Sequence, residues 1–291
     1  ETYQIRPWFQ SYVFFFFIKS LLLININNPF TWVLFIQLTS SILGLISLFY
    51  FYQTYKDKFF EDNLFSRIFI FLFCFFPFFH ARTSSENLGT TFFILGFILF
   101  HKFTIIQRDE KNYYKLILSG TFLGISFIFR YQFVILIVGI FLWLLINNFK
   151  KKTIISLLII SVTIFLIFCF SLGVDYFGYG QFNITFLNYF YVNFFAGKLN
   201  HFGVDPWWYY FKELSITFFP PIGIFFLISI IFNVISKANN IIIFSTLFYF
   251  LVFIIIIHKE LRFLFPILFF VPFIICNFID YLKNNKFINN I

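Results

Sequence analysis

The chain is a series of long apolar runs separated by short polar segments. Several runs approach the roughly 20 residues that a straight helix needs to cross a bilayer, and others are shorter. They predict an all-α, polytopic transmembrane helical bundle of about nine spans, in one domain over residues 1–291. The expected spans are 30–52, 64–79, 87–101, 116–129, 131–147, 153–172, 217–235, 240–257 and 263–281.

Two segments depart from this pattern. Residues 12–24 form an apolar run of only about 13 residues around Lys19, which favours a re-entrant or interfacial helix near the N-terminus. Residues 173–215 are rich in aromatic and polar positions and predict one large extracytoplasmic loop. An aromatic belt at headgroup depth would explain Trp207 without any chemistry. It would not explain the polar residues of the same segment, Asp175, Asn188 and Asp205.

Composition excludes a water-soluble globule. Hydrophobic residues make up 60% of the chain, charged residues 11%, and the mean hydropathy is +0.89, so polar side chains are too few to cover a soluble surface. The net charge of +9 does not indicate a nucleic-acid partner, because the lysines and arginines are scattered through short loops. The cysteines, Cys74, Cys169 and Cys276, lie in apolar runs and indicate neither a disulfide framework nor a metal site.

The distribution of basic residues predicts the orientation in the membrane. If residues 12–24 do not cross, thirteen lysines and arginines fall on one face and eight on the other. The richer face, which includes Lys150, Lys151 and Lys152, is expected to be cytoplasmic. The polar motifs then face the periplasm of a bacterial inner membrane or the lumen of the endoplasmic reticulum.

Polar residues that are costly in a membrane cluster on this extracytoplasmic face. Arg130 interrupts an apolar run, so it either marks a simple turn between two spans or faces a polar cavity. Arginines and lysines beside carboxylates suit an anionic headgroup, because arginine contacts phosphate with two donors. Motifs of soluble enzymes, such as a glycine-rich phosphate loop or His-Glu-x-x-His, do not occur in the sequence.

The strongest motif is His258-Lys259-Glu260-Leu261-Arg262-Phe263, followed by Pro266. It resembles the signature of the membrane mannosyltransferases of GPI-anchor and dolichol-linked oligosaccharide assembly, glycosyltransferase family 22 of the C superfamily. Further segments match that family in order: Glu1–Trp8, Ala81–Asn87, Arg130–Gln132, and the polar positions from Asp175 to Phe211. The family includes bacterial relatives, and the resemblance allows a compact bacterial member.

The resemblance implies inverting transfer of a hexose, namely mannose, from a polyprenyl-phosphate donor to a lipid-linked glycan acceptor on the extracytoplasmic face. The lipid-phosphate sugar donor is a substrate, no cofactor is named beyond it and no residue is assigned to a metal; metal dependence and the oligomeric state stay open. Resemblance and charge together assign the donor phosphate to Arg262, Lys259 and Arg130. Contacts that hold or orient sugar and acceptor are expected from His258, Glu260, Arg82, Glu86, Asp175, Asn188, Asp205 and Trp207.

The resemblance also implies a catalytic carboxylate in a segment upstream of Glu1, so the chain by itself is expected to be an inactive fragment that lacks its first span and first luminal loop. Two other classes remain open. A transporter or lipid flippase predicts inverted repeats and midplane charges, of which the sequence shows only Arg130. A purely structural membrane protein predicts no ordered polar cluster.

Overall fold

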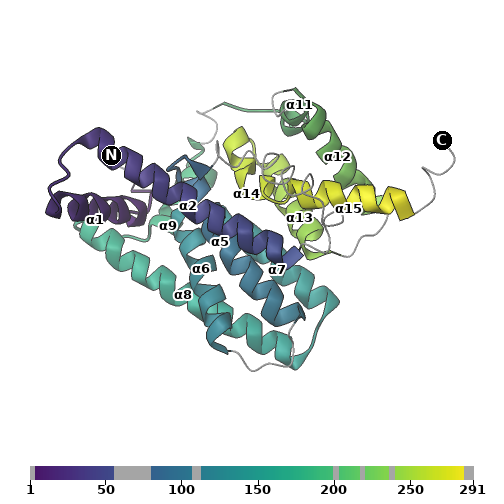
Figure 1. The fold of residues 1–291 in the computed structure, drawn as a ribbon, viewed down its shortest axis with the longest axis horizontal. Helices are drawn as coiled ribbons and strands as arrows, with labels where there is room; N and C mark the ends of the chain where they lie inside the picture. Colours follow the sequence, from purple (N-terminus) through teal and green to yellow (C-terminus); the bar gives the residue numbers. More distant parts are fainter. Residues whose placement is uncertain are drawn as a thin grey trace.

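The computed structural model describes residues 4–55, 80–106, 113–198, 203–216, 220–235 and 240–284. Within these ranges every regular element is a helix, which confirms the all-α prediction (Figure 1). The longer helices are α1 (Phe9–Leu23), α2 (Pro29–Tyr55), α5 (Ser85–His101), α6 (Tyr113–Phe129), α7 (Phe133–Asn147), α8 (Lys151–Tyr179), α12 (Pro220–Ile235), α13 (Ile241–Ile255) and α15 (Val271–Asn284). The shorter elements are η2 (Lys102–Ile106), α9 (Thr185–Phe190), η3 (Tyr191–Phe195), α11 (Tyr209–Ile216), η4 (Leu261–Leu264) and α14 (Phe265–Leu268).

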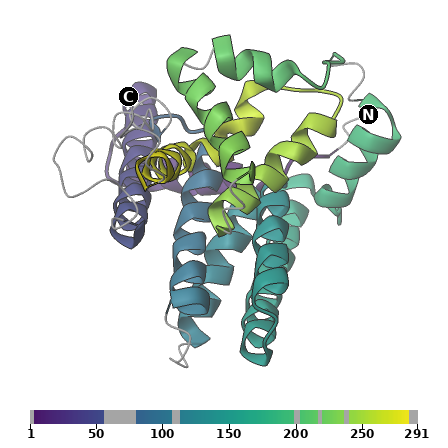
Figure 2. The same ribbon diagram turned by 90° about the vertical axis from the view of Figure 1, so that its right-hand side faces the viewer.

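Helices α5 to α8 pack side by side and extend away from the C-terminal helices (Figure 2). Small residues let their backbones approach closely. A Cβ atom added at Gly96 of α5 would lie 2.8 Å from Leu123 of α6, and one added at Gly120 of α6 would lie 2.7 Å from Thr163 of α8. The hydroxyl of Ser119 donates to the carbonyl of Gly96 at 2.8 Å inside this contact. Close packing therefore holds α5, α6 and α8 in one register.

Helix length and composition mark α2 and α8 as able to cross a membrane by themselves. The segments Leu261–Leu268 and Val271–Ile279 qualify as a third span if they are taken together across their 59° bend. The other apolar helices have 10 to 17 residues, and the expected span 64–79 lies outside the described residues. The total of about nine spans and the re-entrant placement of residues 12–24, which form most of α1, stay predictions.

The predicted loop 173–215 is in large part helical, so that prediction was wrong about its local structure. Helix α8 continues through the polar positions to Tyr179 and ends where Gly180 adopts φ 71°. Asp175, which a loop would expose to water, is buried in this last stretch of α8, where Trp8 and Thr185 satisfy its carboxylate. Helices α9, η3 and α11 follow in the same segment.

Candidate active site

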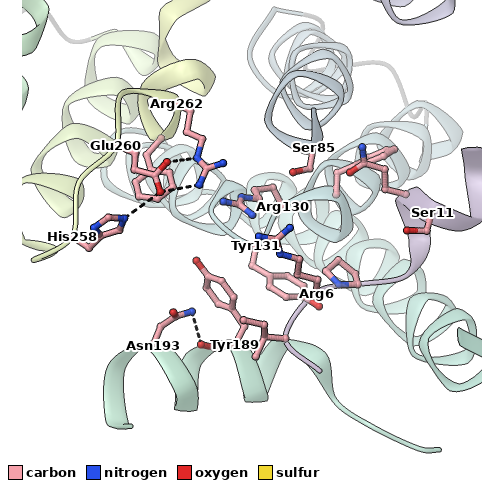
Figure 3. Close-up of a pocket in the computed structure, with 15 residues that line it drawn as sticks. Arg6, Ser11, Ser85, Arg130, Tyr131, Tyr189, Asn193, His258, Glu260 and Arg262 are labelled. Atoms are coloured by element: carbon pink, nitrogen blue, oxygen red, sulfur yellow. Dashed lines mark hydrogen bonds and ion pairs between the residues drawn. The ribbon is translucent and has the colours of Figure 1, made fainter. Parts of the chain in front are cut away.

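A cavity of about 340 Å³ lies where several helices begin or end (Figure 3). Its walls come from the segment before and at the start of α1, the first residue of α5, the α6–α7 junction, α9 with η3, and the segment that joins α13 to η4. Residues far apart in sequence thus meet at one polar chamber. Its lining residues are Ile5, Arg6, Pro7, Gln10, Ser11, Ser85, Phe129, Arg130, Tyr131, Tyr189, Asn193, His258, Glu260, Arg262 and Phe263.

Arg130 stands at the break between α6 and α7 and also lines this cavity. Its Nη2 lies 3.1 Å from Oε1 of Glu86, whose side chain is only 6% exposed. Glu86 sits in the first turn of α5, which Ser84 caps by accepting from the amide of Asn87. The Nε of Arg130 is buried and has no hydrogen-bond partner among the described residues. Within the described ranges this donor is therefore unsatisfied but enclosed by protein atoms, so only the terminal nitrogens of Arg130 can face the cavity.

Arg262 forms the second cationic group and is held by Glu260. Its Nη2 donates to Oε1 of Glu260 at 2.8 Å, and its Nε contacts Oε2 of the same carboxylate. His258 Nε2 lies 3.1 Å from Oε1 on the other side. Burial alone would raise the pKa of Glu260, but the bonds from Arg262 and His258 outweigh it and lower the pKa. The remaining nitrogen of Arg262 points away from Glu260 (Figure 3).

Arg6 supplies a third guanidinium from the segment before α1. Its backbone carbonyl accepts from the hydroxyl of Tyr179 at 2.7 Å, whereas its side chain makes no ion pair with the described carboxylates. Burial raises the pKa of Tyr189, which lies among Arg130, Arg6 and Arg262, although all three arginines act to lower it. Three arginines against Glu86 and Glu260 give a formal net charge of +1 around the cavity, histidine not being counted.

A second cavity, of about 300 Å³ and lined mainly by apolar side chains, adjoins the first. The two share Tyr131, Tyr189, Asn193, His258 and Phe263 as lining residues. The other walls of the second cavity are α7, α9 with η3, and α13. Ile255, at its edge, is 80% exposed. The polar chamber therefore lies next to an apolar cavity, one of whose lining side chains is at the outer surface of the helix bundle.

Lys259 and Asp205 bond to each other and do not line the polar cavity. Lys259 is 4% exposed, and its Nζ donates to the carbonyls of Ile256 at 2.5 Å and Asp205 at 3.2 Å. Its backbone N–H donates to Oδ2 of Asp205, and the amide of Asp205 donates to the carbonyl of Ile257. Burial lowers the pKa of Lys259, with Asp205 opposing the effect. These contacts hold the segment before α11 against the end of α13.

The remaining predicted contacts also lie outside the cavity lining. Asn188 donates to the side-chain oxygen of Asn183 at 2.6 Å, and the carbonyl of Arg82 accepts from the side chains of Ser40 and Asn87. Trp207 is 65% exposed and meets Phe211 edge-on, while Asp175 is fully buried. The structure thus brings together Arg130, Glu86, His258, Glu260 and Arg262, but not Lys259, Arg82, Asp175, Asn188, Asp205 or Trp207. The phosphate contact expected of Lys259 and the sugar or acceptor contacts expected of the other five residues stay predictions.

Tyr189, Asn193 and Ser85 line the cavity, although they were not among the predicted site residues. Tyr189 and Asn193 are four positions apart on α9 and η3, and the side chain of Asn193 donates to the carbonyl of Tyr189 at 2.8 Å. Residues four positions apart lie on the same face of a helix, so this spacing could have placed both at the site. The segment had been predicted as a loop, and the spacing was therefore not used. Among the residues that the structure describes, no cluster of three His, Cys, Asp or Glu side chains forms a metal site.

Comparison with known protein families identifies the family of this chain. The model of the Alg9-like mannosyltransferase family covers residues 1–289, which is nearly the whole chain. No curated protein and no solved structure gives a significant match.

Proposed function

Because this chain belongs to the Alg9-like mannosyltransferase family, we propose that the polar cavity transfers mannose from a polyprenyl-phosphate donor to a lipid-linked glycan. The family supports transfer of mannose by an integral membrane protein and does not favour the transporter or flippase alternative. The donor, the acceptor and the extracytoplasmic placement are parts of the proposal.

The observation that carries the proposal is the gathering of Arg6, Arg130 and Arg262 around one cavity. Together with the carboxylates of Glu86 and Glu260 they leave a net charge of +1. A sugar linked through a phosphodiester carries one negative charge, which this surplus neutralises. Arginine also suits a phosphate better than lysine does, because its planar fork donates two parallel hydrogen bonds.

The same charge favours the reaction as well as binding. In the proposed step an acceptor hydroxyl oxygen bonds to the anomeric carbon, the bond from that carbon to the phosphate oxygen breaks, and a general base takes the hydroxyl proton. The electron pair of the broken bond stays on the phosphate, which becomes a dianionic monoester. Arg130 and Arg262 then interact more strongly with the transition state than with the donor, which is the condition for catalysis. We assign no general base among the described residues.

The apolar cavity supports a lipid-linked donor over a soluble sugar nucleotide. A donor phosphate held by Arg262 and Arg130 places its polyprenyl chain next to Val134 and Ile135 of α7 and Val252 of α13. Near the exposed side chain of Ile255 the chain would leave the protein for the bilayer.

Transfer assays on membranes that express the complete reading frame test this function. The host must lack polyprenyl-phosphate-mannose synthase, so that radiolabelled GDP-mannose cannot generate the lipid donor. We expect label in lipid-linked glycan from polyprenyl-phosphate mannose and none from GDP-mannose. Arg262→Gln should slow transfer by more than roughly a hundredfold with little loss of stability, whereas Lys151→Gln, at the first residue of α8, should not alter it. Transfer from GDP-mannose alone, or equal activity of both variants, would contradict the proposal.

The extracytoplasmic placement has its own test. Single cysteines at Lys151 and at the exposed Val204 are introduced into a protein without its native cysteines. Impermeant maleimide should label the Val204 position from the extracytoplasmic side and the Lys151 position only after the membrane is opened. Labelling of both from one side would overturn the orientation.

A further inference from the structure

The buried carboxylate of Asp175 contacts two segments that carry walls of the polar cavity. Its Oδ1 accepts from the backbone N–H of Trp8, and its Oδ2 accepts from the hydroxyl of Thr185, both at 2.7 Å. Asp175 and Thr185 are each 0% exposed. A buried carboxylate is costly unless such bonds satisfy it, so these contacts confine the three residues to one geometry.

A third hydrogen bond extends this chain to the α6–α7 junction. The hydroxyl of Tyr131 contacts Oγ1 of Thr185, and Tyr131 is only 4% exposed. An ionised carboxylate accepts and never donates, so the single hydroxyl proton of Thr185 is committed to Asp175. Tyr131 must therefore donate to Thr185. The protons of the chain all point toward Asp175.

Each end of this chain stands beside an arginine of the cavity. Tyr131 directly follows Arg130, and Trp8 follows Arg6 by two positions. Thr185 begins α9, which carries Tyr189 into the cavity. Asp175 itself is not a lining residue, so it reaches the cavity only through its partners.

We propose that Asp175 is a positioning residue that sets Arg6 and Arg130 for the donor phosphate through Trp8, Thr185 and Tyr131. The inference rests on the proposed function, because it assigns a purpose to the arginine placement of that site. Asp175 makes no contact with the donor. Its carboxylate fixes three separate backbone segments relative to the end of α8, and these segments hold two of the three guanidinium groups.

The test compares Asp175→Asn with Thr185→Ser and Thr185→Val. In Asp175→Asn one carboxylate oxygen becomes an NH2 group at nearly constant volume, and this new donor must face another donor, either the N–H of Trp8 or the hydroxyl of Thr185. We expect its kcat/KM for polyprenyl-phosphate mannose to fall at least about tenfold, with the KM for donor raised. Thr185→Ser keeps the hydroxyl and should stay within about twofold of the parent, whereas Thr185→Val should resemble Asp175→Asn.

Amide hydrogen exchange supplies a readout that does not depend on transfer. In Asp175→Asn, exchange should accelerate in residues 4–8 and 130–132 and stay unchanged in α13. Parental exchange in both segments, or parental kcat/KM despite faster exchange, would overturn the inference. If Asp175→Asn fails to fold, the pair Thr185→Val and Thr185→Ser decides by the same measurements: equal activity of the two would refute the positioning role.

The outcomes also distinguish failure of the positioning role from failure of the proposed mannose transfer. If the parent protein transfers no mannose from polyprenyl-phosphate donors, the proposed function fails whatever the variants show. If the parent transfers mannose and the Asp175 and Thr185 variants match it, only the positioning role fails.

Discussion

Replacing Arg262 by lysine separates phosphate binding from simple anchoring of the chain at the membrane surface. The structure shows a guanidinium that offers two donors to one carboxylate, Glu260, in the geometry that also matches a phosphate. Lysine keeps the positive charge but loses the planar fork. The exchange therefore alters the number and direction of the hydrogen bonds while it leaves the net charge of the cavity unchanged.

The expected magnitudes differ between stability and turnover. The Arg262 side chain is 50% exposed, and such ion pairs contribute about 0–1 kcal/mol to folding, so Arg262→Lys should unfold near the parental temperature. Loss of one preorganised donor to a developing phosphate charge should raise the barrier by about 3 kcal/mol, or roughly a hundredfold in kcat. A large loss of rate with little loss of stability is the expected result.

The measurement is kcat at saturating polyprenyl-phosphate mannose, on protein reconstituted from its complete reading frame. Arg262→Gln, which removes the charge as well as the fork, should be slower than Arg262→Lys. Near-parental kcat in the lysine variant would refute the phosphate role and assign Arg262 to anchoring. An equal loss of thermal stability in both variants would instead indicate that the pair with Glu260 is structural.

Three further predictions follow from the packing and the ion pairs. Arg130→Gln leaves the carboxylate of Glu86 buried without its cation and should destabilise the protein by about 3–5 kcal/mol. The double variant Arg130→Gln with Glu86→Gln removes that buried charge, so its unfolding temperature should be higher than that of the single variant. Gly120→Ala should cost about 1–3 kcal/mol by pushing α6 from α8, while Gly173→Ala, with open space around its Cβ, should be neutral or stabilising. The pKa of Glu260 is lower in the folded protein than the value near 4.5 expected in the unfolded chain, so the ionised carboxylate stabilises the fold above pH 4.5. This stabilisation is lost as the pH falls through the folded pKa. The unfolding temperature of Glu260→Gln should lack this loss in acid.

Apolar run lengths alone predicted the helical architecture, because each helix in a membrane must satisfy its own backbone hydrogen bonds and bury apolar side chains. The cost of an arginine in hydrocarbon likewise marked Arg130 as the end of a helix, and the structure confirms a break between Phe129 and Phe133. The motif near the C-terminus singled out His258, Glu260 and Arg262, and all three line the polar cavity, while their roles stay predictions.

Tertiary structure decided which residues of these motifs line the cavity and which instead bond to the surrounding backbone. Lys259 and Arg262 are three positions apart and carry the same charge, yet Lys259 turns to backbone carbonyls and Arg262 lines the cavity. Asp175 was expected to hold or orient sugar and acceptor, and nothing in the sequence indicated that its carboxylate bonds to Trp8, 167 positions earlier. Hydrophobic periodicity reports only on neighbours along one helix. Which buried polar group meets which depends on bonds between distant segments, and these form only when the helices pack.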